Sequence, residues 1–156
     1  GTDTYPHNFL EEMRSVGSIA RVAMETVDDL GTRDVFEAAT LGGAKALGRN
    51  DIGRLAPGCK ADFVLIDLKD PSMMPLREPL RSLIFVAAER AVRDVYVDGK
   101  QVVADGKVLN IDLQAASEAL EAAQQRSIMQ VSGRDWAGRS SEELAPMVLP
   151  TVDCLN

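Results

Sequence analysis

The chain has 156 residues, of which 46% are hydrophobic and 26% are charged, a composition typical of a soluble globular protein with one modest core. Its formal net charge of −7 disfavours nucleic acid and anionic membrane as partners, because both attract basic patches. No apolar run reaches membrane-spanning length. The two cysteines, Cys59 and Cys154, are too far apart for a zinc knuckle, and we expect free thiols in a cytoplasmic protein.

The N-terminal part of the chain has the period of a helix. Asn8, followed by Glu11 three positions later, is close to a capping box and predicts a helix start. Apolar residues then recur at intervals of three and four, which predicts one apolar face of an amphipathic helix. The residues of this face are Phe9, Met13, Val16, Ala20, Ala23 and Val27.

Two short helices are expected next. Thr32 and Thr40 are plausible N-caps for them. Gly48 is expected to end the second helix in a left-handed conformation. Gly42 and Gly43 inside that helix would be unfavourable unless a neighbouring backbone approaches closely.

The period changes after the turn-rich residues 56–60. Residues 61–68 (ADFVLIDL) form an apolar run rich in β-formers, which predicts a largely buried strand. A loop with three prolines follows. Residues 80–88 (LRSLIFVAA) are expected to be helical.

Three β-rich runs follow, and short turn sequences separate them. Asp98-Gly99 lies between the first and second runs, and Asp105-Gly106 lies between the second and third. Such pairs supply the positive φ angles that a type I′ hairpin turn requires. The sequence therefore predicts an antiparallel meander of residues 92–97, 100–104 and 107–109.

The C-terminal part of the chain returns to a helical pattern. Asp112 is expected to cap a long helix, and Ser140 with Glu143 predicts a second, short one. The organisation is helices, then strands, then helix. Because strands and helices do not alternate, this chain is not expected to form a barrel or a doubly wound sheet by itself.

Two residues near the N-terminus are candidates for chemistry. Asp3 lies in a Gly/Thr-flanked segment before a capped helix, where a barrel strand would end on the catalytic face. A carboxylate there can ligate a divalent metal and transfer protons, or it is simply a turn-former. His7 is the sole histidine, so no histidine-rich metal site is self-contained in this chain. It donates a hydrogen bond in a pocket, binds a metal, or only precedes the helix cap.

The order of the motifs resembles that in the C-terminal third of metal-dependent amidohydrolases. The segments are GTDT at the N-terminus, residues 37–68 and residues 92–109, and the similarity extends to about residue 131. The most specific part is A-T-x-x-G-A-x-A-L-G-x-x-x-x-G-x-L-x-x-G-x-x-A-D-x-V over residues 39–64. The cytosine/guanine deaminase and triazine chlorohydrolase branch is the most similar.

The resemblance implies an α/β parent with a (β/α)₈ barrel and a composite β-sandwich assembled from both ends of the full chain. Residues 1–50 would be the end of the barrel, with strand eight and the helices after it. Residues 51–110 would be the C-terminal part of the sandwich, and residues 111–156 a C-terminal helix and tail. We therefore expect this chain to be a C-terminal fragment.

By the same resemblance, Asp3 matches the aspartate that contacts the metal and acts as general base at the end of strand eight. The metal of the full-length parent would be zinc, or alternatively iron. The family's His-x-His pair and later histidines have no counterpart here, and His7 matches none of them. A site without its imidazole ligands does not hold the metal, so the isolated chain is expected to be inactive and to bind no metal by itself.

The parent would hydrolyse C–N bonds other than peptide bonds, by deaminating a purine, pyrimidine or triazine-like ring. Chloride displacement and cyclic amide hydrolysis are the alternative reactions, and a non-catalytic scaffold or interaction module is the alternative class. The expected partner is a small heterocyclic substrate. Uncovered apolar surfaces also predict a homo-oligomer or self-association, through the face of Phe9, Met13 and Val16 or through the sandwich edge.

Overall fold

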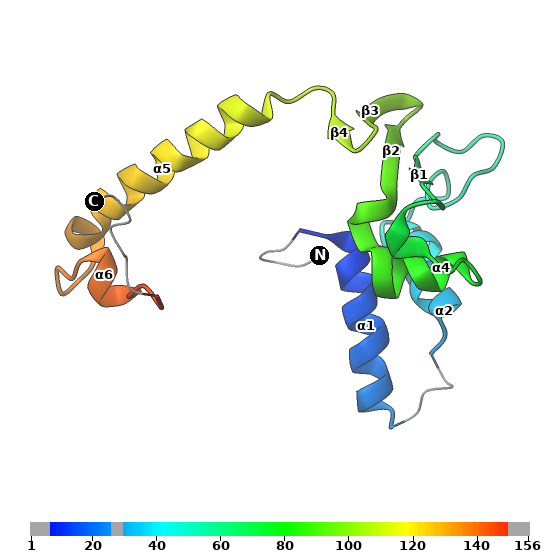
Figure 1. The fold of residues 1–156 in the computed structure, drawn as a ribbon, viewed down its shortest axis with the longest axis horizontal. Helices are drawn as coiled ribbons and strands as arrows, with labels where there is room; N and C mark the ends of the chain where they lie inside the picture. The colour runs from blue at the N-terminus through cyan, green and yellow to red at the C-terminus, as the bar shows by residue number, and fades with distance from the viewer. Residues whose placement is uncertain (1–6, 26–29, 150–156) are drawn as a thin grey trace. The chain divides into compact units, whose positions relative to one another are not determined.

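A computed structural model describes residues 7–25 and 30–149. Residues 1–110 and 111–156 form two separate compact units. The first contains helices followed by a small antiparallel sheet, and the second contains only helices in its described part, which confirms the predicted order (Figure 1). Among the described helices, none has the length and apolar character needed to cross a membrane.

Helical elements, most of them short, make up the larger part of the regular secondary structure in the first unit. Two of them, η1 and η3, are π-helical turns, and η2 and η4 are 3₁₀ turns. In chain order the elements are α1 (Phe9–Ala23), α2 (Thr32–Glu37), η1 (Ala38–Gly42), α3 (Gly43–Ala46), η2 (Pro71–Met73), α4 (Pro79–Ser82), η3 (Leu83–Ala87) and η4 (Ala88–Ala91).

Helix α1 begins where the sequence predicts. The side chain of Asn8 accepts hydrogen bonds from the backbone N–H groups of Leu10 and Glu11 at 3.1 and 3.3 Å, which confirms the N-cap. The helix ends at Ala23, before the predicted limit. Val27 lies outside the described residues.

The buried face of α1 differs from the expected one. Met13 and Gly17 are buried, whereas Phe9 and Val16 are exposed. Gly17 faces inward because the ring of Phe85 lies against it, and a Cβ there would be 3.1 Å from Phe85 Cζ. The expected exposed face of Phe9, Met13 and Val16 is therefore wrong at Met13, which belongs to the core.

Helices α2 and α3 are joined into one helix by the π-turn η1, since the backbone stays right-handed helical at both junctions. Both expected N-caps are therefore wrong. Gly31 occupies the cap position instead of Thr32. Thr40 lies inside the joined helix, where its hydroxyl donates to the carbonyl of Phe36 at 2.8 Å.

At two positions of this region the backbone requires a glycine. Gly48 ends α3 with φ of 65°, which confirms the predicted left-handed position. The close backbone approach expected at Gly42 and Gly43 is not found. It occurs at Gly53, where a Cβ would lie 2.7 Å from the carbonyl oxygen of Thr40.

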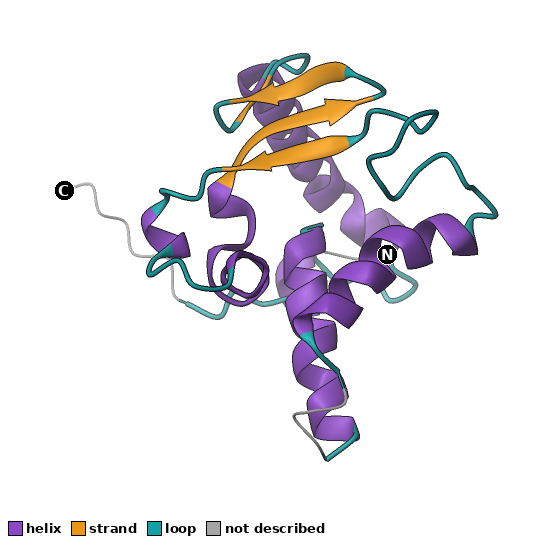
Figure 2. Cartoon of the chain, turned by 90° about the vertical axis from the view of Figure 1, so that its right-hand side faces the viewer, coloured by secondary structure: helices purple, strands orange, loops and turns teal. Residues whose placement is uncertain are grey.

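The four strands of the described region form one antiparallel sheet in the order β1-β2-β3-β4 (Figure 2). Asp98 and Gly99 have φ angles of 50° and 77°, and Asp105 and Gly106 have 46° and 72°. Both predicted turns and the meander are therefore confirmed. The strands are β1 (Phe63–Ile66), β2 (Val92–Val97), β3 (Lys100–Ala104) and β4 (Lys107–Val108).

Strand β1 is not the largely buried strand that its apolar run predicts. Val64 and Leu65 are exposed, and Ile66 alone of these three packs against the core. Val64 is the first of a row of valines that are paired from strand to strand across the sheet. This row is Val64, Val95, Val103 and Val108.

The core of this unit lies around residues 83–91. The elements α4, η3 and η4 make this part of the chain helical, which confirms the helix predicted over residues 80–88. Two clusters of buried side chains meet there, and Leu10 of α1 packs against both. One cluster is Met73, Leu83, Ala87 and Ala91, and the other is Met13, Val35 and Ile84. Small alanines allow the neighbouring elements to approach closely.

The second unit contains α5 (Leu113–Arg134) and α6 (Ser141–Leu144). The Asp112 carboxylate accepts from the backbone N–H of Ala115 at 3.0 Å, which confirms the cap of α5. Ser140 and Glu143 form the predicted capping box, with bonds of 2.7 and 3.2 Å. The caps predicted at Asn8, Asp112 and Ser140 are thus correct, whereas those predicted at Thr32 and Thr40 are wrong.

Replacing Gly53 by alanine is expected to destabilise the chain more than replacing Gly58. Both glycines have positive φ angles, 81° and 84°, where alanine costs about 1–2 kcal/mol. Only at Gly53 would the new Cβ also crowd a backbone carbonyl, for roughly 1–3 kcal/mol more. Urea unfolding of the two variants measures the difference, and equal losses would contradict the observed approach of residues 40 and 53.

Candidate functional site

The two residues predicted to carry chemistry precede α1. Asp3 lies outside the described residues, so its position relative to His7 is not seen. His7 is described, and it is exposed immediately before the cap of the helix. The next residue, Asn8, caps α1 and also contacts a residue far along the chain.

Asn8 makes contacts in two directions. Its side-chain oxygen caps α1, and its amide nitrogen donates to Glu89 Oε2, 81 residues further along the chain. The pKa of the Glu89 carboxyl is lowered by a hydrogen bond from its own backbone and by the Asn8 amide. The start of α1 is therefore fixed to η4.

The position of Glu89 depends on an unusual backbone turn. Ala88, which precedes it, has φ of 50° and ψ of −131°, in a sparsely populated region for a residue other than glycine. Its methyl group is buried. The sequence predicts the Asn8 cap but not Glu89, because no local pattern links residues so far apart.

The described residues do not fit a metal centre. They include no group of three or more His, Cys, Asp or Glu side chains that could hold an ion. Cys59 is half-buried and is not part of a disulfide, and its Sγ lies 3.9 Å from the backbone oxygen of Asn50. This agrees with a structural thiol.

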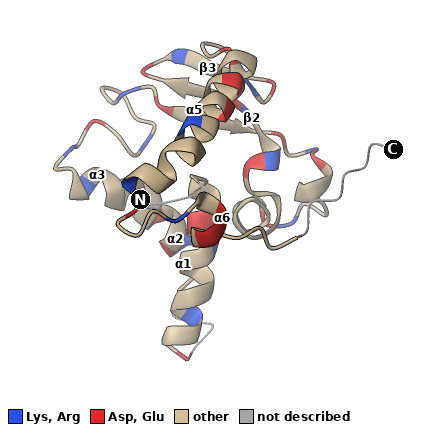
Figure 3. Cartoon of the chain, turned by 90° about the vertical axis from the view of Figure 1, so that its left-hand side faces the viewer, with Lys and Arg blue, Asp and Glu red and all other residues tan. Residues whose placement is uncertain are grey.

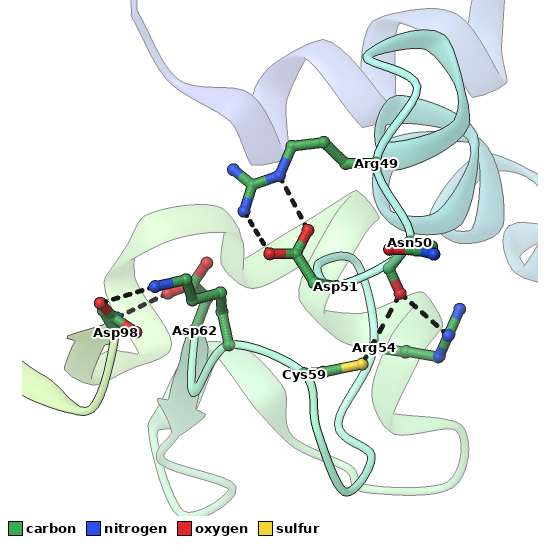
Figure 4. A network of polar contacts seen from close by, with 8 residues as sticks. Arg49, Asn50, Asp51, Arg54, Cys59, Asp62 and Asp98 are labelled. Carbon is green, nitrogen blue, oxygen red and sulfur yellow. Dashed lines mark hydrogen bonds and ion pairs between the residues drawn. The ribbon is translucent and has the colours of Figure 1, made fainter.

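A polar network joins the loop after α3 to the β2–β3 turn (Figure 4). Arg49 binds both carboxylate oxygens of Asp51 at 2.8 and 2.6 Å, which lowers the pKa of Asp51. Lys60 pairs with Asp98 at 2.9 Å, and Asp62 accepts from the Asp98 backbone at 2.6 Å. Since these groups are each bound to another chain group, the network holds the loop in place.

Asp94 is a buried acid that the sequence analysis missed. It is 8% exposed, and its carboxylate accepts from Arg93 Nε at 2.8 Å, from Gln101 at 3.3 Å and from the Asp105 backbone at 3.1 Å. Arg93 and the Asp105 N–H lower its pKa. Asp94 thus orders the second turn of the meander. A charge inside the run VRDVYV is the pattern that could have revealed it.

The family model for the amidohydrolase family matches residues 1–102. A 5-methylthioadenosine/S-adenosylhomocysteine deaminase of Pelotomaculum thermopropionicum is 37% identical over 72% of this chain. The chain belongs to the amidohydrolase family. The same alignment covers 27% of the deaminase, and a 5′-deoxyadenosine deaminase of Methanosarcina mazei is 32% identical, with 31% of its length covered. The chain thus spans about a quarter to a third of these relatives.

Solved structures give the same relationship for the fold. A zinc-bound adenosine deaminase from Xanthomonas campestris matches 75% of this amidohydrolase chain with a TM-score of 0.72 and 31% identity, over 27% of its own length. The zinc complex of an atrazine chlorohydrolase from Arthrobacter aurescens matches 72% with a TM-score of 0.66 and 26% identity, over 25% of its length.

The contact of Asn8 with Glu89 can be separated from the helix cap by two substitutions. Asn8→Ser retains a capping oxygen, and we expect it to lower the free energy of unfolding by about 0.5–1.5 kcal/mol through loss of the Glu89 bond. Asn8→Ala should lose about 1 kcal/mol more. Chemical denaturation measures both, and in a Glu89→Ala background Asn8→Ser should have almost no effect. An undiminished effect there would contradict the contact.

Asp94→Asn is expected to lower the melting temperature by several degrees at pH 7. Because the folded-state pKa of Asp94 lies below its ordinary value of 3.8, its charge contributes stability above that pH. This contribution is lost as the pH falls through the folded-state pKa. Melting curves from pH 7 down to pH 3 should show the two proteins converging below about pH 4. A constant difference would contradict the role of the charge.

Proposed function

We propose that this chain is the C-terminal portion of a metal-dependent hydrolase that acts on C–N bonds other than peptide bonds and deaminates an adenine-like ring. The observation that carries the proposal is the identity of 37% with a deaminase of adenine nucleosides over 72% of the chain. Deaminases of 5′-deoxyadenosine and adenosine are similar at 32% and 31% identity. The substrate class is thus a small purine nucleoside.

Within such an enzyme we assign residues 1–50 to the last barrel strand and the helices after it. Residues 51–110 would supply the C-terminal strands of a composite β-sandwich, with residues 111–156 as a helical end. The antiparallel sheet with a valine row on one face supports this assignment, because a second layer is needed to cover such a face. The assignment also fits the share of the relatives that the chain spans.

Asp3 would be the general base and the metal-contacting carboxylate of the complete enzyme, and His7 a substrate hydrogen-bonding residue. The place of Asp3 in the GTDT motif and the anchored Asn8 five residues later support this role. The described residues would not hold zinc by themselves. We therefore expect the isolated chain to lack deaminase activity, with the imidazole ligands supplied by other polypeptide.

Chloride displacement from a triazine is the second candidate reaction. The zinc-bound atrazine chlorohydrolase matches this chain with a TM-score of 0.66. The adenosine deaminase match is higher in both TM-score and identity, so deamination is preferred. A non-catalytic scaffold remains the alternative class, and loss of activity in the experiment below would favour it.

A chimera tests the proposal directly. Its N-terminal part is the portion of the Pelotomaculum deaminase that this chain does not match, and its C-terminal part is this chain. Deamination of 5′-methylthioadenosine is expected, and Asp3→Asn should lower kcat about 10²–10⁴-fold, since a general base is lost.

The matched control is Asp112→Asn, the same chemical change at a helix cap, where asparagine serves as well as aspartate. It should leave kcat unchanged. A folded chimera without deaminase activity, or equal effects of the two substitutions, would contradict the proposed function.

A further inference from the structure

Helix α1 has a second apolar face that no described element of the first unit covers. Phe9, Val16 and Ile19 are 60%, 51% and 67% exposed, and Ala23 is also exposed. Their spacing of seven, three and four residues places them on one side of the helix. We call these four residues the outer face of α1.

The outer face is distinct from the packed side of the helix. Met13 and Gly17 of the packed side lie against Val35, Ile84 and Phe85, and the principal described contacts of α1 are with α2, η3 and η4. The charged residues of α1 are Glu11, Glu12, Arg14 and Arg21, and the rest of its ribbon is uncharged (Figure 3). Apart from Glu12, which lies between Phe9 and Val16 on the same side of the helix, the outer face is apolar. An exposed apolar surface of this kind marks a site that another polypeptide covers.

A second copy of this chain is a poor occupant. The outer face from Phe9 to Ala23 extends over about 21 Å of helix at 1.5 Å per residue and contains three large side chains. A stable dimer interface buries roughly 800 Å² on each partner and some twenty residues a side. A symmetric contact between two such stripes is too small to meet that requirement.

The length of the relatives points to a different occupant. The chain corresponds to 27% of the Pelotomaculum deaminase and 27% of the solved adenosine deaminase, and α1 lies within the matched amidohydrolase region. We propose that the outer face of α1 docks the remaining part of an amidohydrolase polypeptide, where it contributes to a larger interface. The inference rests on the proposed function only in treating this chain as one portion of such an enzyme.

Co-expression tests the docking without requiring activity. The chain, carrying an affinity tag, is produced together with the unmatched portion of the Pelotomaculum deaminase as a separate polypeptide, and the complex is quantified by size-exclusion chromatography. We expect co-purification, reduced at least tenfold by Ile19→Glu. Ser18→Glu is the matched control, because Ser18 is an exposed neighbour on another side of the helix, and it should leave recovery unchanged.

Three results would overturn the inference. They are absence of a complex with the unaltered chain, equal recovery of the Ile19→Glu and Ser18→Glu complexes, and a dimer of the chain alone that Ile19→Glu converts to monomer. A drop in the melting temperature of the isolated chain on Ile19→Glu alone would also count against it, because it would show that this chain already covers the face. A complex without deaminase activity would leave the docking intact and contradict only the proposed function.

Discussion

The packing of residues 83–91 between α1 and the sheet is the interaction on which the first unit depends. Both core clusters contain residues of this segment. Four of its residues are almost completely buried, namely Ile84, Ala87, Ala88 and Ala91. It contains a π-turn and a 3₁₀ turn, and it leads directly into β2. Larger residues at the alanine positions would separate α1 from the sheet. The same segment positions Glu89, so it forms both the core and the contact with Asn8 at the start of α1.

In the described part of this unit, the acidic side chains serve to hold turns and loops. The ordered carboxylates near the sheet, Asp62 and Asp94, are bound to backbone or side-chain groups of the chain. They hold turns in place and leave no cluster of metal ligands among the described residues. In the proposed enzyme the chain would contribute Asp3 and a fixed support for it, while the remaining ligands would come from elsewhere.

Most features set by neighbouring residues could be predicted from the sequence, and the exceptions are the N-caps expected at Thr32 and Thr40. The Asp-Gly turns, the left-handed Gly48 and the caps at Asn8, Asp112 and Ser140 are all correct, because each depends on a few adjacent residues.

Features set by distant contacts could not be predicted from the sequence. The face of α1 follows from Phe85 against Gly17, the close approach at Gly53 follows from Thr40, and β1 is exposed because little of it reaches the core. The Asn8–Glu89 contact spans 81 residues and has no local pattern. The family relationship could be recognised from the motif at residues 39–64, whereas the site role of Asp3 stays a prediction.

The most direct measurement is the position of the Asp3 carboxylate in a zinc-loaded complex of this chain with the unmatched portion of the Pelotomaculum deaminase. Crystals of that complex, with the zinc located by anomalous scattering, would give the distance between the metal and the carboxylate. We predict an Asp3 oxygen at about 2.0–2.2 Å from zinc, with histidines of the other polypeptide completing the coordination. A fully ligated zinc with Asp3 turned towards bulk solvent would contradict it.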